Sequence, residues 1–241
     1  MIGNKTISLI VPCKNEADII GSFIHRVPEC VDEIIIVDNN STDDTATIAK
    51  KSGAIVVSEK RNIRGIGYGY AHQTGLAKAT GDYIVAMDGD DTYPLSSIQT
   101  IVQYIERYDL DIVFCNRLPL MNKKAISWVR QLGIRILNLE ARILYGIHIH
   151  DILTGMWIGR RTAVKDVFVT SGDWNYSMEI KLNAFTNASI RSSEYHIRHF
   201  ERKHALSKQN LFRTGFHHAL FLFRKRITSF VWNVQRPAFT N

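Results

Sequence analysis

Five short, nearly continuous apolar runs alternate with segments of helical pattern through the first half of the chain. The runs cover residues 7–12, 33–38, 54–58, 82–88 and 111–115. Each is short and apolar enough to be a strand that is buried on both faces. Strands that alternate with helices in this way predict an α/β fold, in which helices cover a mostly parallel sheet.

The pattern loosens after residue 116. We expect a long helix over 126–145, a strand or loop over 151–159, a helix over 174–185 and a strand over 189–199. No Pro/Gly-rich linker or break in composition separates these segments from the first half. The sequence therefore predicts one domain over residues 1–208 and a C-terminal appendage over 209–241.

The formal net charge of +7 makes nucleic acid, anionic lipid or a phosphorylated substrate the classes of partner to consider. Basic and aromatic residues do not interleave on one predicted face, which argues against nucleic acid. The N-terminal residues lack the pattern of a secretory signal, and three widely spaced cysteines argue against a disulfide framework. We expect a cytoplasmic protein.

Three carboxylates directly follow the apolar run 82–88, namely Asp88, Asp90 and Asp91. Carboxylates this close repel one another and burial adds to the cost, so the cluster needs a cation as a partner. Asp88 and Asp90 flank Gly89, and alternate residues around a flexible glycine can aim two carboxylates at one Mg²⁺ or Mn²⁺ ion, which in turn binds substrate phosphates. The alternative is a set of turn-forming aspartates before Pro94.

Two other predicted strands also end in polar residues. PCKNE (12–16) contains Pro12, Asn15 and Glu16, and VDNNSTDDT (37–45) contains Asp38. A carboxylate accepts two donors at once, so Asp38 suits a ribose or a base edge, and Glu16 suits a nucleoside hydroxyl. The carboxyl ends of parallel strands are where such folds bind ligands. The alternative reading of the Asp38 segment is a helix cap.

A glycine-rich segment covers residues 64–82, in which Gly65, Gly67 and Gly69 alternate. The dinucleotide-binding fingerprint G-x-G-x-x-G needs its third glycine at the position of Tyr70, so this is not a Rossmann phosphate loop. Backbone N–H groups near Gly67 can still bind a phosphate, because the segment enters a helix.

These motifs, followed by DILTGM and RKHALSK, occur in the order seen in the inverting family 2 glycosyltransferases. Over about residues 6–208 the chain most resembles the dolichol- or polyprenol-phosphate sugar synthases. The resemblance implies a Rossmann-like GT-A nucleotide-sugar fold in which Asp88 and Asp90 hold a metal and the donor diphosphate. It also implies that the nucleoside lies among Pro12, Asn15, Glu16, Asp38 and Asp88, with Gly89 and Arg117 as further donor contacts.

The later motifs depart from the family pattern at single positions. One of these motifs has the sequence D-x-T-S-G-F-R in the synthases. Asp151, Thr154 and Gly155 match it, whereas Met156 and Trp157 replace its aromatic and basic residues. The motif R-x-x-G-x-S-K appears with Arg202, Ser207 and Lys208, and with Ala205 in place of glycine. Arg202, Ser207 and Lys208 are the residues we expect to bind an acceptor phosphate, because Arg and Lys suit phosphate oxygens.

The resemblance implies metal-dependent, inverting transfer of a hexose from a GDP- or UDP-sugar to a polyprenyl phosphate at the cytoplasmic membrane face. The expected catalytic residues are Asp88, Asp90, Asp151, Arg202 and Lys208. A lipid phosphate, with a second pKa of about 6, is ionised at neutral pH and needs no strong base. The alternative acceptor is a saccharide hydroxyl, which needs a general base, and Asp151 and Glu179 are the candidates for it.

The C-terminal residues predict a basic amphipathic helix. From Phe212 onward apolar residues recur mostly at spacings of three and four, and Arg213, Arg224 and Lys225 lie on other sides. The segment lacks the ~18 consecutive apolar residues of a membrane span. We expect it to bind a membrane surface peripherally; packing on the domain or a homodimer contact is the alternative.

Overall fold

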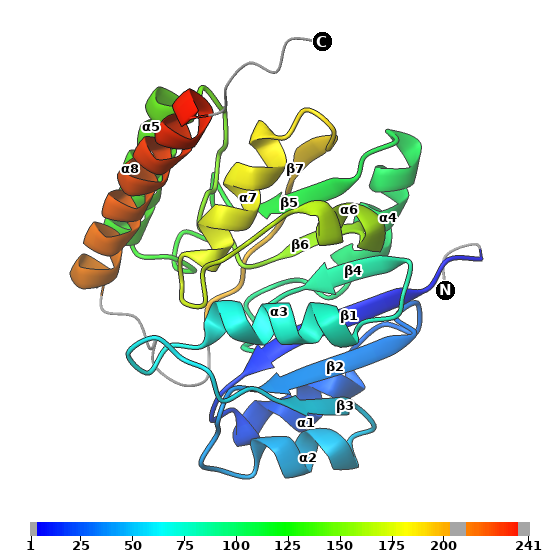
Figure 1. Cartoon of the computed structure of the whole chain (residues 1–241). Helices are drawn as coiled ribbons and strands as arrows, with labels where there is room; N and C mark the ends of the chain where they lie inside the picture. Colours follow the sequence, from blue (N-terminus) through cyan, green and yellow to red (C-terminus); the bar gives the residue numbers. More distant parts are fainter. Residues whose placement is uncertain (1–3, 203–210, 236–241) are drawn as a thin grey trace.

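The computed structural model describes residues 4–202 and 211–235 and has a seven-stranded sheet at its centre (Figure 1). The strands are β1 (Ile7–Cys13), β2 (Glu33–Asp38), β3 (Ile55–Ser58), β4 (Tyr83–Ala86), β5 (Ile112–Asn116), β6 (Trp157–Arg160) and β7 (Ser192–His196). Their order across the sheet is β3-β2-β1-β4-β6-β5-β7. The five apolar runs of the first half are therefore strands, as predicted.

Most neighbouring strands are parallel, and β6 is the exception. It lies between β4 and β5 and runs antiparallel to both. Of the segment 151–159, for which the sequence predicts a strand or loop, residues up to 156 precede this strand and only the end joins it. The α/β fold class with a mostly parallel sheet is confirmed.

Eight helices surround the sheet in the described part of the chain. They are α1 (Ala17–His25), α2 (Thr45–Lys51), α3 (Tyr68–Lys78), α4 (Ser97–Arg107), α5 (Trp128–Tyr145), α6 (Arg161–Asp166), α7 (Tyr176–Thr186) and α8 (Leu211–Gln235). Helices α1, α2 and α4 pack on one face of the sheet, and α3, α6 and α7 pack on the other (Figure 1).

Strand β1 shows why the runs are apolar on both sides. Leu9 and Val11 belong to the core beneath α1 and α4, whereas Ile10 belongs to the core beneath α3. The close packing of α3 on β1 requires Gly75, because a Cβ atom there would lie 2.3 Å from Cγ2 of Ile10. A strand buried on both faces fixes the orientation of the loop that follows it.

The order in which successive strands are added to the sheet reverses between β1 and β4. It passes from β1 outward to β2 and β3, then returns to place β4 on the other side of β1. The crevice beyond the carboxyl ends of such a strand pair is where open α/β sheets bind ligands. Residues 12–16 begin at the carboxyl end of β1 and residues 88–92 follow β4, so both segments border this crevice.

Helices α5 and α8 lie side by side at the end of the molecule away from β3 (Figure 1). Leu137 and Ala141 of α5 pack with Leu182 of α7 and Leu222 of α8, and the Tyr145 hydroxyl donates to the carbonyl of Leu222 at 2.7 Å. None of the helices in residues 4–202 and 211–235 is long and apolar enough to cross a bilayer.

Candidate active site

Asp88 and Asp90 lie beyond β4 and are held by different partners. The Tyr68 hydroxyl donates to Oδ1 of Asp88 at 3.0 Å. Oδ1 of Asp90 accepts from the backbone N–H and the hydroxyl of Thr92, at 3.2 and 2.6 Å. Asp91 has a positive φ of 63° and instead forms an ion pair of 2.5 Å with Arg26. The cluster therefore separates into a pair that faces the crevice and a third carboxylate that does not.

The environment of Asp88 disfavours its ionised form. Burial and the nearby Asp90 carboxylate raise the pKa of Asp88 to about 6. Gly155 lies against the same carboxylate: a Cβ atom there would be 2.9 Å from Oδ2 of Asp88 and 2.8 Å from the Tyr68 hydroxyl. The glycine of the DILTGM motif thus leaves the space around the Asp88 oxygens open.

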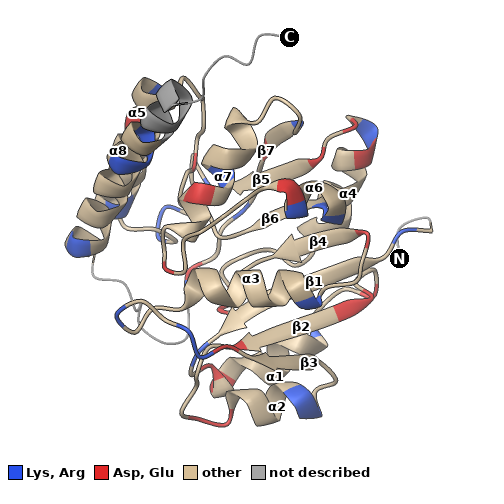
Figure 2. Ribbon diagram, viewed as in Figure 1, with Lys and Arg blue, Asp and Glu red and all other residues tan. Residues whose placement is uncertain are grey.

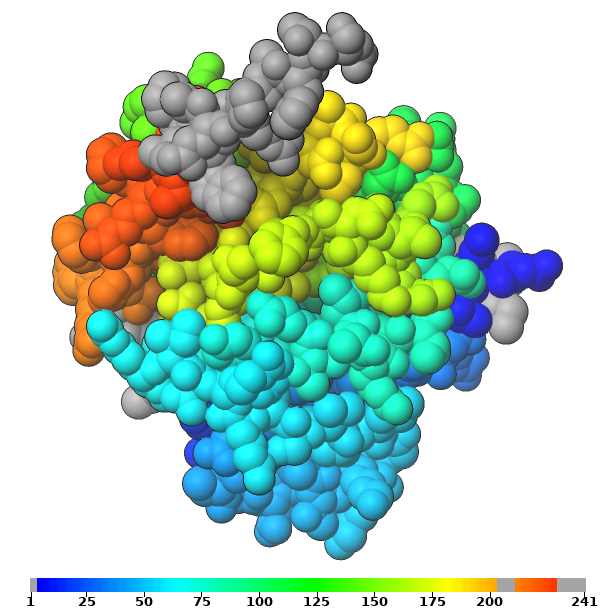
Figure 3. Space-filling model, in the orientation of Figure 1, coloured from blue at the N-terminus to red at the C-terminus, as the bar shows by residue number. Residues whose placement is uncertain are grey.

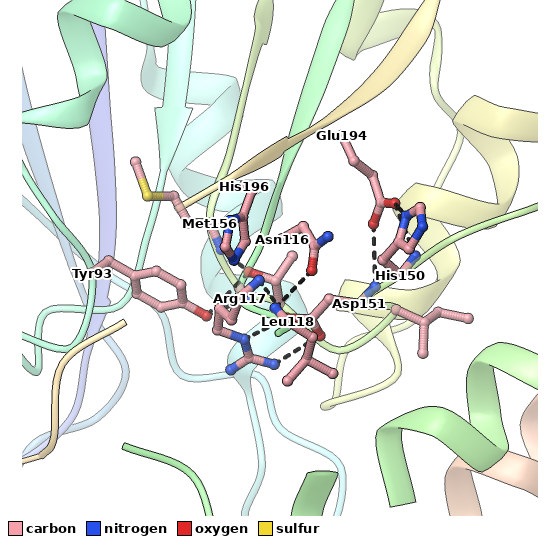
Figure 4. A network of polar contacts seen from close by, with 12 residues as sticks. Tyr93, Asn116, Arg117, Leu118, His150, Asp151, Met156, Glu194 and His196 are labelled. Carbon is pink, nitrogen blue, oxygen red and sulfur yellow. Dashed lines mark hydrogen bonds and ion pairs between the residues drawn. The ribbon is translucent and has the colours of Figure 1, made fainter. Parts of the chain in front are cut away.

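Arg117, directly after β5, is fixed by Asp151 (Figure 4). Its Nε donates to Oδ2 of Asp151 at 2.6 Å and its Nη2 to Oδ1 at 2.9 Å, and its backbone N–H donates to Oδ2 as well. Figure 4 shows Arg117 between Tyr93 and Asp151. The Tyr93 hydroxyl accepts from the backbone N–H of Gly155 at 2.8 Å, which ties Arg117's surroundings to those of Asp88.

The segment that carries Asp151 is itself held by a buried lysine of α7. Nζ of Lys181 donates to the carbonyls of Asp151, Ile152 and Thr154 at 2.9, 2.9 and 3.0 Å. Burial lowers the pKa of Lys181 to about 7. On the other side, Glu194 of β7 accepts from the backbone N–H of Asp151.

Neither carboxylate proposed as a general base has open oxygens. Burial acts to raise the pKa of Asp151, but the charge and hydrogen bonds of Arg117 hold it below its ordinary value. Glu179 accepts from the N–H of Ser171 at 2.7 Å and from Lys225 of α8 at 2.9 Å. These contacts outweigh the effect of burial and lower the pKa of Glu179. Both groups are placed to hold structure together.

Arginines gather beside the carboxylate pair. Nη2 of Arg202 forms an ion pair with Oδ2 of Asp90. Burial and then the positive charges of Arg202 and Arg117 lower the pKa of Arg130, which places the three cations in one electrostatic neighbourhood. Such a concentration of guanidinium groups suits phosphate oxygens.

A single cavity of about 1070 Å³ joins these groups. Its polar end is bordered by Asp88, Asp90, Arg117, Arg130 and Arg202. Its other end lies between α5 and α8 and is bordered largely by apolar residues: Val129, Leu132, Ile136, Leu137, Leu211, Phe212, Phe216 and Ala219. The cavity thus has a charged end at the switch point and an apolar end between two helices.

The predicted donor residues mostly lie on this cavity. Pro12, Asn15, Glu16, Gly67, Asp88, Asp90 and Arg117 border it. Asp38 does not, and its Oδ1 instead accepts from the N–H of Ser41 at 3.4 Å. Gly89 does not border the cavity either, and a Cβ atom there would be 2.9 Å from Cγ1 of Val11. Ser207 and Lys208 fall outside the described residues.

Asn15 joins the loops after β1 and β2. Its Oδ1 accepts from the N–H of Thr42 at 2.8 Å, and its own N–H donates to the Ser41 hydroxyl at 3.0 Å. Gly67 caps α3, and a Cβ atom there would be 2.5 Å from Oδ1 of Asn39. The PCKNE and VDNNSTDDT segments are therefore one structural unit.

Sequence reasoning missed several residues that border the cavity, among them Tyr68, Tyr93, Arg130 and His199. His199 is 6% exposed, and its Nδ1 has no hydrogen-bond partner among the described residues. Burial lowers the pKa of His199 to about 3, so the ring is neutral. Tyr68 lies in the glycine-rich segment 64–82 and Tyr93 lies two residues after Asp91, so these two positions had a local signal, whereas Arg130 and His199 had none.

A cavity at the switch point of an α/β sheet, with paired carboxylates and arginines at one end, is the arrangement of an enzyme that acts on phosphorylated substrates. Residues 8–168 match the family model described as Glycosyl transferase family 2, and the chain belongs to this family. It is therefore a glycosyltransferase, and the family predicted from the motifs is confirmed.

Relatives agree with this assignment, and solved structures share the fold. The chain is 30% identical to an uncharacterized glycosyltransferase of Mycobacterium tuberculosis over 183 residues, 76% of this chain and 80% of the relative. It is 28% identical to a dodecaprenyl-phosphate galacturonate synthase of Rhizobium johnstonii over 223 residues, 86% of this chain and 63% of the relative. The fold is shared with Mycobacterium tuberculosis glucosyl-3-phosphoglycerate synthase in complex with Mn²⁺, UDP-glucose and glycerol 3-phosphate, at a TM-score of 0.67 and 22% identity, covering 92% of this chain and 80% of that one.

Proposed function

We propose that this glycosyltransferase moves a hexose from a GDP- or UDP-sugar to a polyprenyl phosphate. The observation that carries the proposal is the cavity, which joins a charged end at the switch point to an apolar end between α5 and α8. A donor diphosphate and an acceptor phosphate match the charged end, and an isoprenoid tail matches the apolar one. The relative named as a dodecaprenyl-phosphate galacturonate synthase supports an acceptor of this class.

A saccharide hydroxyl acceptor is the second candidate, and the site favours it less. Such an acceptor needs a general base. Asp151 and Glu179 are each held by a cation and by backbone N–H groups. A phosphate acceptor is already an anion at neutral pH and needs no proton to be removed.

The side chains present fit a hard divalent cation. Asp88 and Asp90 offer carboxylate oxygens, and Gly155 leaves the space beside Asp88 open. The described residues contain no cluster of three or more His, Cys, Asp or Glu groups, so the protein would supply two carboxylates and leave other positions for water and phosphate. Mg²⁺ is commonly held in this way, and Mn²⁺ takes the same ligands. When bound, the ion neutralises charge that grows on the leaving diphosphate.

The protein's own groups then position two anions for in-line attack. The loops after β1, β2 and β4 enclose the nucleotide. Asn15 and Gly67 hold these loops together, and Asp38 and Gly89 support the loops from behind the residues that line the cavity. Arg117, fixed by Asp151, and Arg202 hold phosphate oxygens in place, and Ser207 and Lys208 add to the acceptor side. Fixed cations in a site with little water stabilise the departing diphosphate more strongly than solvent does.

We further propose that α8, the main element of the segment 209–241, binds the cytoplasmic membrane face together with α5, while residues 1–208 form the catalytic domain. Large apolar side chains are exposed on both helices, for example Trp128 and Ile143 at 73% and Phe212 at 80%. The sequence of α8 has no Asp or Glu, and basic residues occur on both helices, Arg on α5 and both Arg and Lys on α8 (Figure 2). Helix α8 forms one flank of the molecular surface (Figure 3). An apolar face beside basic residues suits an anionic bilayer; a homodimer through the same flank is the alternative.

The test uses the full chain, radiolabelled GDP- and UDP-hexoses, Mn²⁺ and vesicles that contain undecaprenyl phosphate. We expect a labelled product that enters chloroform and is released by mild acid. A product that appears only in water, and only when a saccharide is added, would refute the lipid-phosphate acceptor. Sedimentation with anionic but not neutral vesicles tests the membrane contact, and a stable dimer that ignores vesicles would contradict it.

A further inference from the structure

Helices α5 and α8 each contain an interior glycine that borders the cavity, Gly133 and Gly215. A Cβ atom added at either position would have no described heavy atom within 4 Å, beyond the helix's own backbone and the chain neighbours. Neither glycine has a positive φ. Other glycines near the site, such as Gly67 and Gly155, are required by close contacts, but these two are not.

A glycine inside a helix lowers the stability of that helix, because the unfolded chain gains more freedom there than with alanine. Gly75 in α3 offsets this loss by letting the helix pack on Ile10. Gly133 and Gly215 have no comparable contact among the described residues. The space that their missing side chains leave is open, and it is part of the cavity.

The surroundings of this space specify what fits it. Leu132, Ile136, Phe212 and Phe216 border the cavity near the two glycines and are at least 49% exposed. Large apolar side chains left exposed beside a cavity mark a binding surface for an apolar ligand. The groove between α5 and α8 is therefore suited to a flexible hydrocarbon chain.

The charged end of the same cavity specifies the other end of the ligand. Arg117, Arg130 and Arg202 present cations there, and the buried Nδ1 of His199 has no hydrogen-bond partner within residues 4–202 and 211–235. A buried polar atom without a partner indicates a ligand or water that supplies one. The cavity thus complements an anionic head joined to an apolar tail.

We propose that the isoprenoid chain of the acceptor lies in the groove between α5 and α8 and passes over Gly133 and Gly215. The inference rests on the proposed function and adds the path of the chain. The two glycines keep the groove open, so they select acceptors by the length and bulk of the chain and do not act on the phosphate. Side chains larger than a methyl group at either position narrow the groove.

The first test compares two acceptors in the full-length enzyme. Gly133→Leu and Gly215→Leu place a bulky side chain in the groove, and leucine favours the helix, so both proteins should fold. We expect transfer to undecaprenyl phosphate to fall by about tenfold or more, whereas transfer to dimethylallyl phosphate changes by less than about twofold. Gln103→Leu adds the same side chain to the exposed surface of α4, outside the cavity, and should leave both rates unchanged.

Each outcome is distinct. If wild-type protein transfers sugar to neither prenyl phosphate, the proposed function fails. If wild-type protein transfers sugar to undecaprenyl phosphate and both leucine variants keep that rate, the isoprenoid chain takes another path. The same conclusion follows if the variants lose transfer to both acceptors equally while UDP and Mn²⁺ still raise their melting temperature. The second test needs no variant: a benzophenone-tagged prenyl phosphate should label wild-type peptides that contain Gly133 or Gly215, and undecaprenyl phosphate should compete. Labelling confined to other peptides would overturn the proposal.

Discussion

Arg117 and Asp151, 34 residues apart in the chain, form a two-point ion pair with N–O distances of 2.6 and 2.9 Å, and the Asp151 side chain is fully buried. The guanidinium borders the cavity, and the two contacts with the carboxylate fix its plane there. We therefore propose that Asp151 acts through Arg117 as a positioning residue. Even the nearly isosteric substitution Asp151→Asn should therefore disturb the position of Arg117.

We expect Asp151→Asn to lower the free energy of unfolding by about 3 kcal/mol, because removing one partner of a buried pair leaves the other charge uncompensated. Turnover should fall as well, since Arg117 loses its fixed orientation. Urea unfolding and steady-state kinetics measure the two effects. The matched control is Asp91→Asn, which breaks the more exposed pair with Arg26 and should change stability by less than about 1 kcal/mol. Equal losses in the two variants would contradict the distinction.

Asp90→Asn should weaken metal binding without unfolding the protein. In wild-type protein, Mn²⁺ together with a UDP- or GDP-sugar should raise the melting temperature, because a ligand bound only by the folded state stabilises it. One carboxylate of the pair is lost in the variant, so the rise should be smaller or absent. Differential scanning fluorimetry with and without EDTA measures it. Stabilisation by metal that is unchanged in Asp90→Asn would exclude this carboxylate as a ligand.

Arg202 donates to Oδ2 of Asp90, an oxygen that the proposed metal ion would also need. We therefore expect Arg202→Gln to bind Mn²⁺ more tightly than wild type when no donor is present, by about fivefold, the equivalent of one partly exposed ion pair. The same variant should turn over more slowly, because a cation for phosphate is gone. Titration calorimetry gives the affinity and kinetics the rate. Weaker Mn²⁺ binding in the variant would show that Arg202 does not compete for the site.

The sequence predicted those parts of the molecule that depend on local pattern. Buried strands have apolar runs, and Asp88 and Asp90 follow such a run, so their place at the carboxyl edge could be inferred. The insertion of β6 between β4 and β5 could not, because an antiparallel strand of four residues has the same local pattern as a parallel one. The contacts of Lys181, Glu179 and His199 were equally hidden, since each joins residues distant in the chain.

A buried histidine predicts how stability depends on pH. His72 is 1% exposed, its ring stacks on Tyr176 at 4.8 Å, and neither ring nitrogen has a hydrogen-bond partner in the described part of the chain. Burial lowers the pKa of His72 to about 3 from an ordinary value of 6.5. The stability of the neutral ring is thus fully present above pH 6.5 and is lost as the pH falls toward 3, because only the unfolded chain takes up the proton.

For this group the loss should reach about 2 kcal/mol at pH 5. We expect His72→Phe, which keeps the aromatic stack without the titrating group, to reduce the difference in unfolding free energy between pH 7 and pH 5 by about that amount. His199 and His218 remain in the variant, so part of the dependence persists. Urea unfolding at pH 7, 6 and 5 measures it. A variant whose stability falls as steeply as that of wild type would show that His72 is not the source.

A change at Lys181 should affect both stability and activity, because Lys181 holds the segment 151–154 that carries Asp151. In Lys181→Met the carbonyls of Asp151, Ile152 and Thr154 lose their shared donor while they stay buried. Unpaired buried carbonyls should lower the free energy of unfolding by about 3 kcal/mol. The Asp151 carboxylate should then hold Arg117 less firmly, so kcat/KM should fall about tenfold at temperatures where the variant is fully folded. The control is Lys165→Met, which removes an exposed lysine of α6 and should change neither quantity. If Lys181→Met loses stability but keeps the kcat/KM of wild type, Arg117 is held in place without help from this lysine.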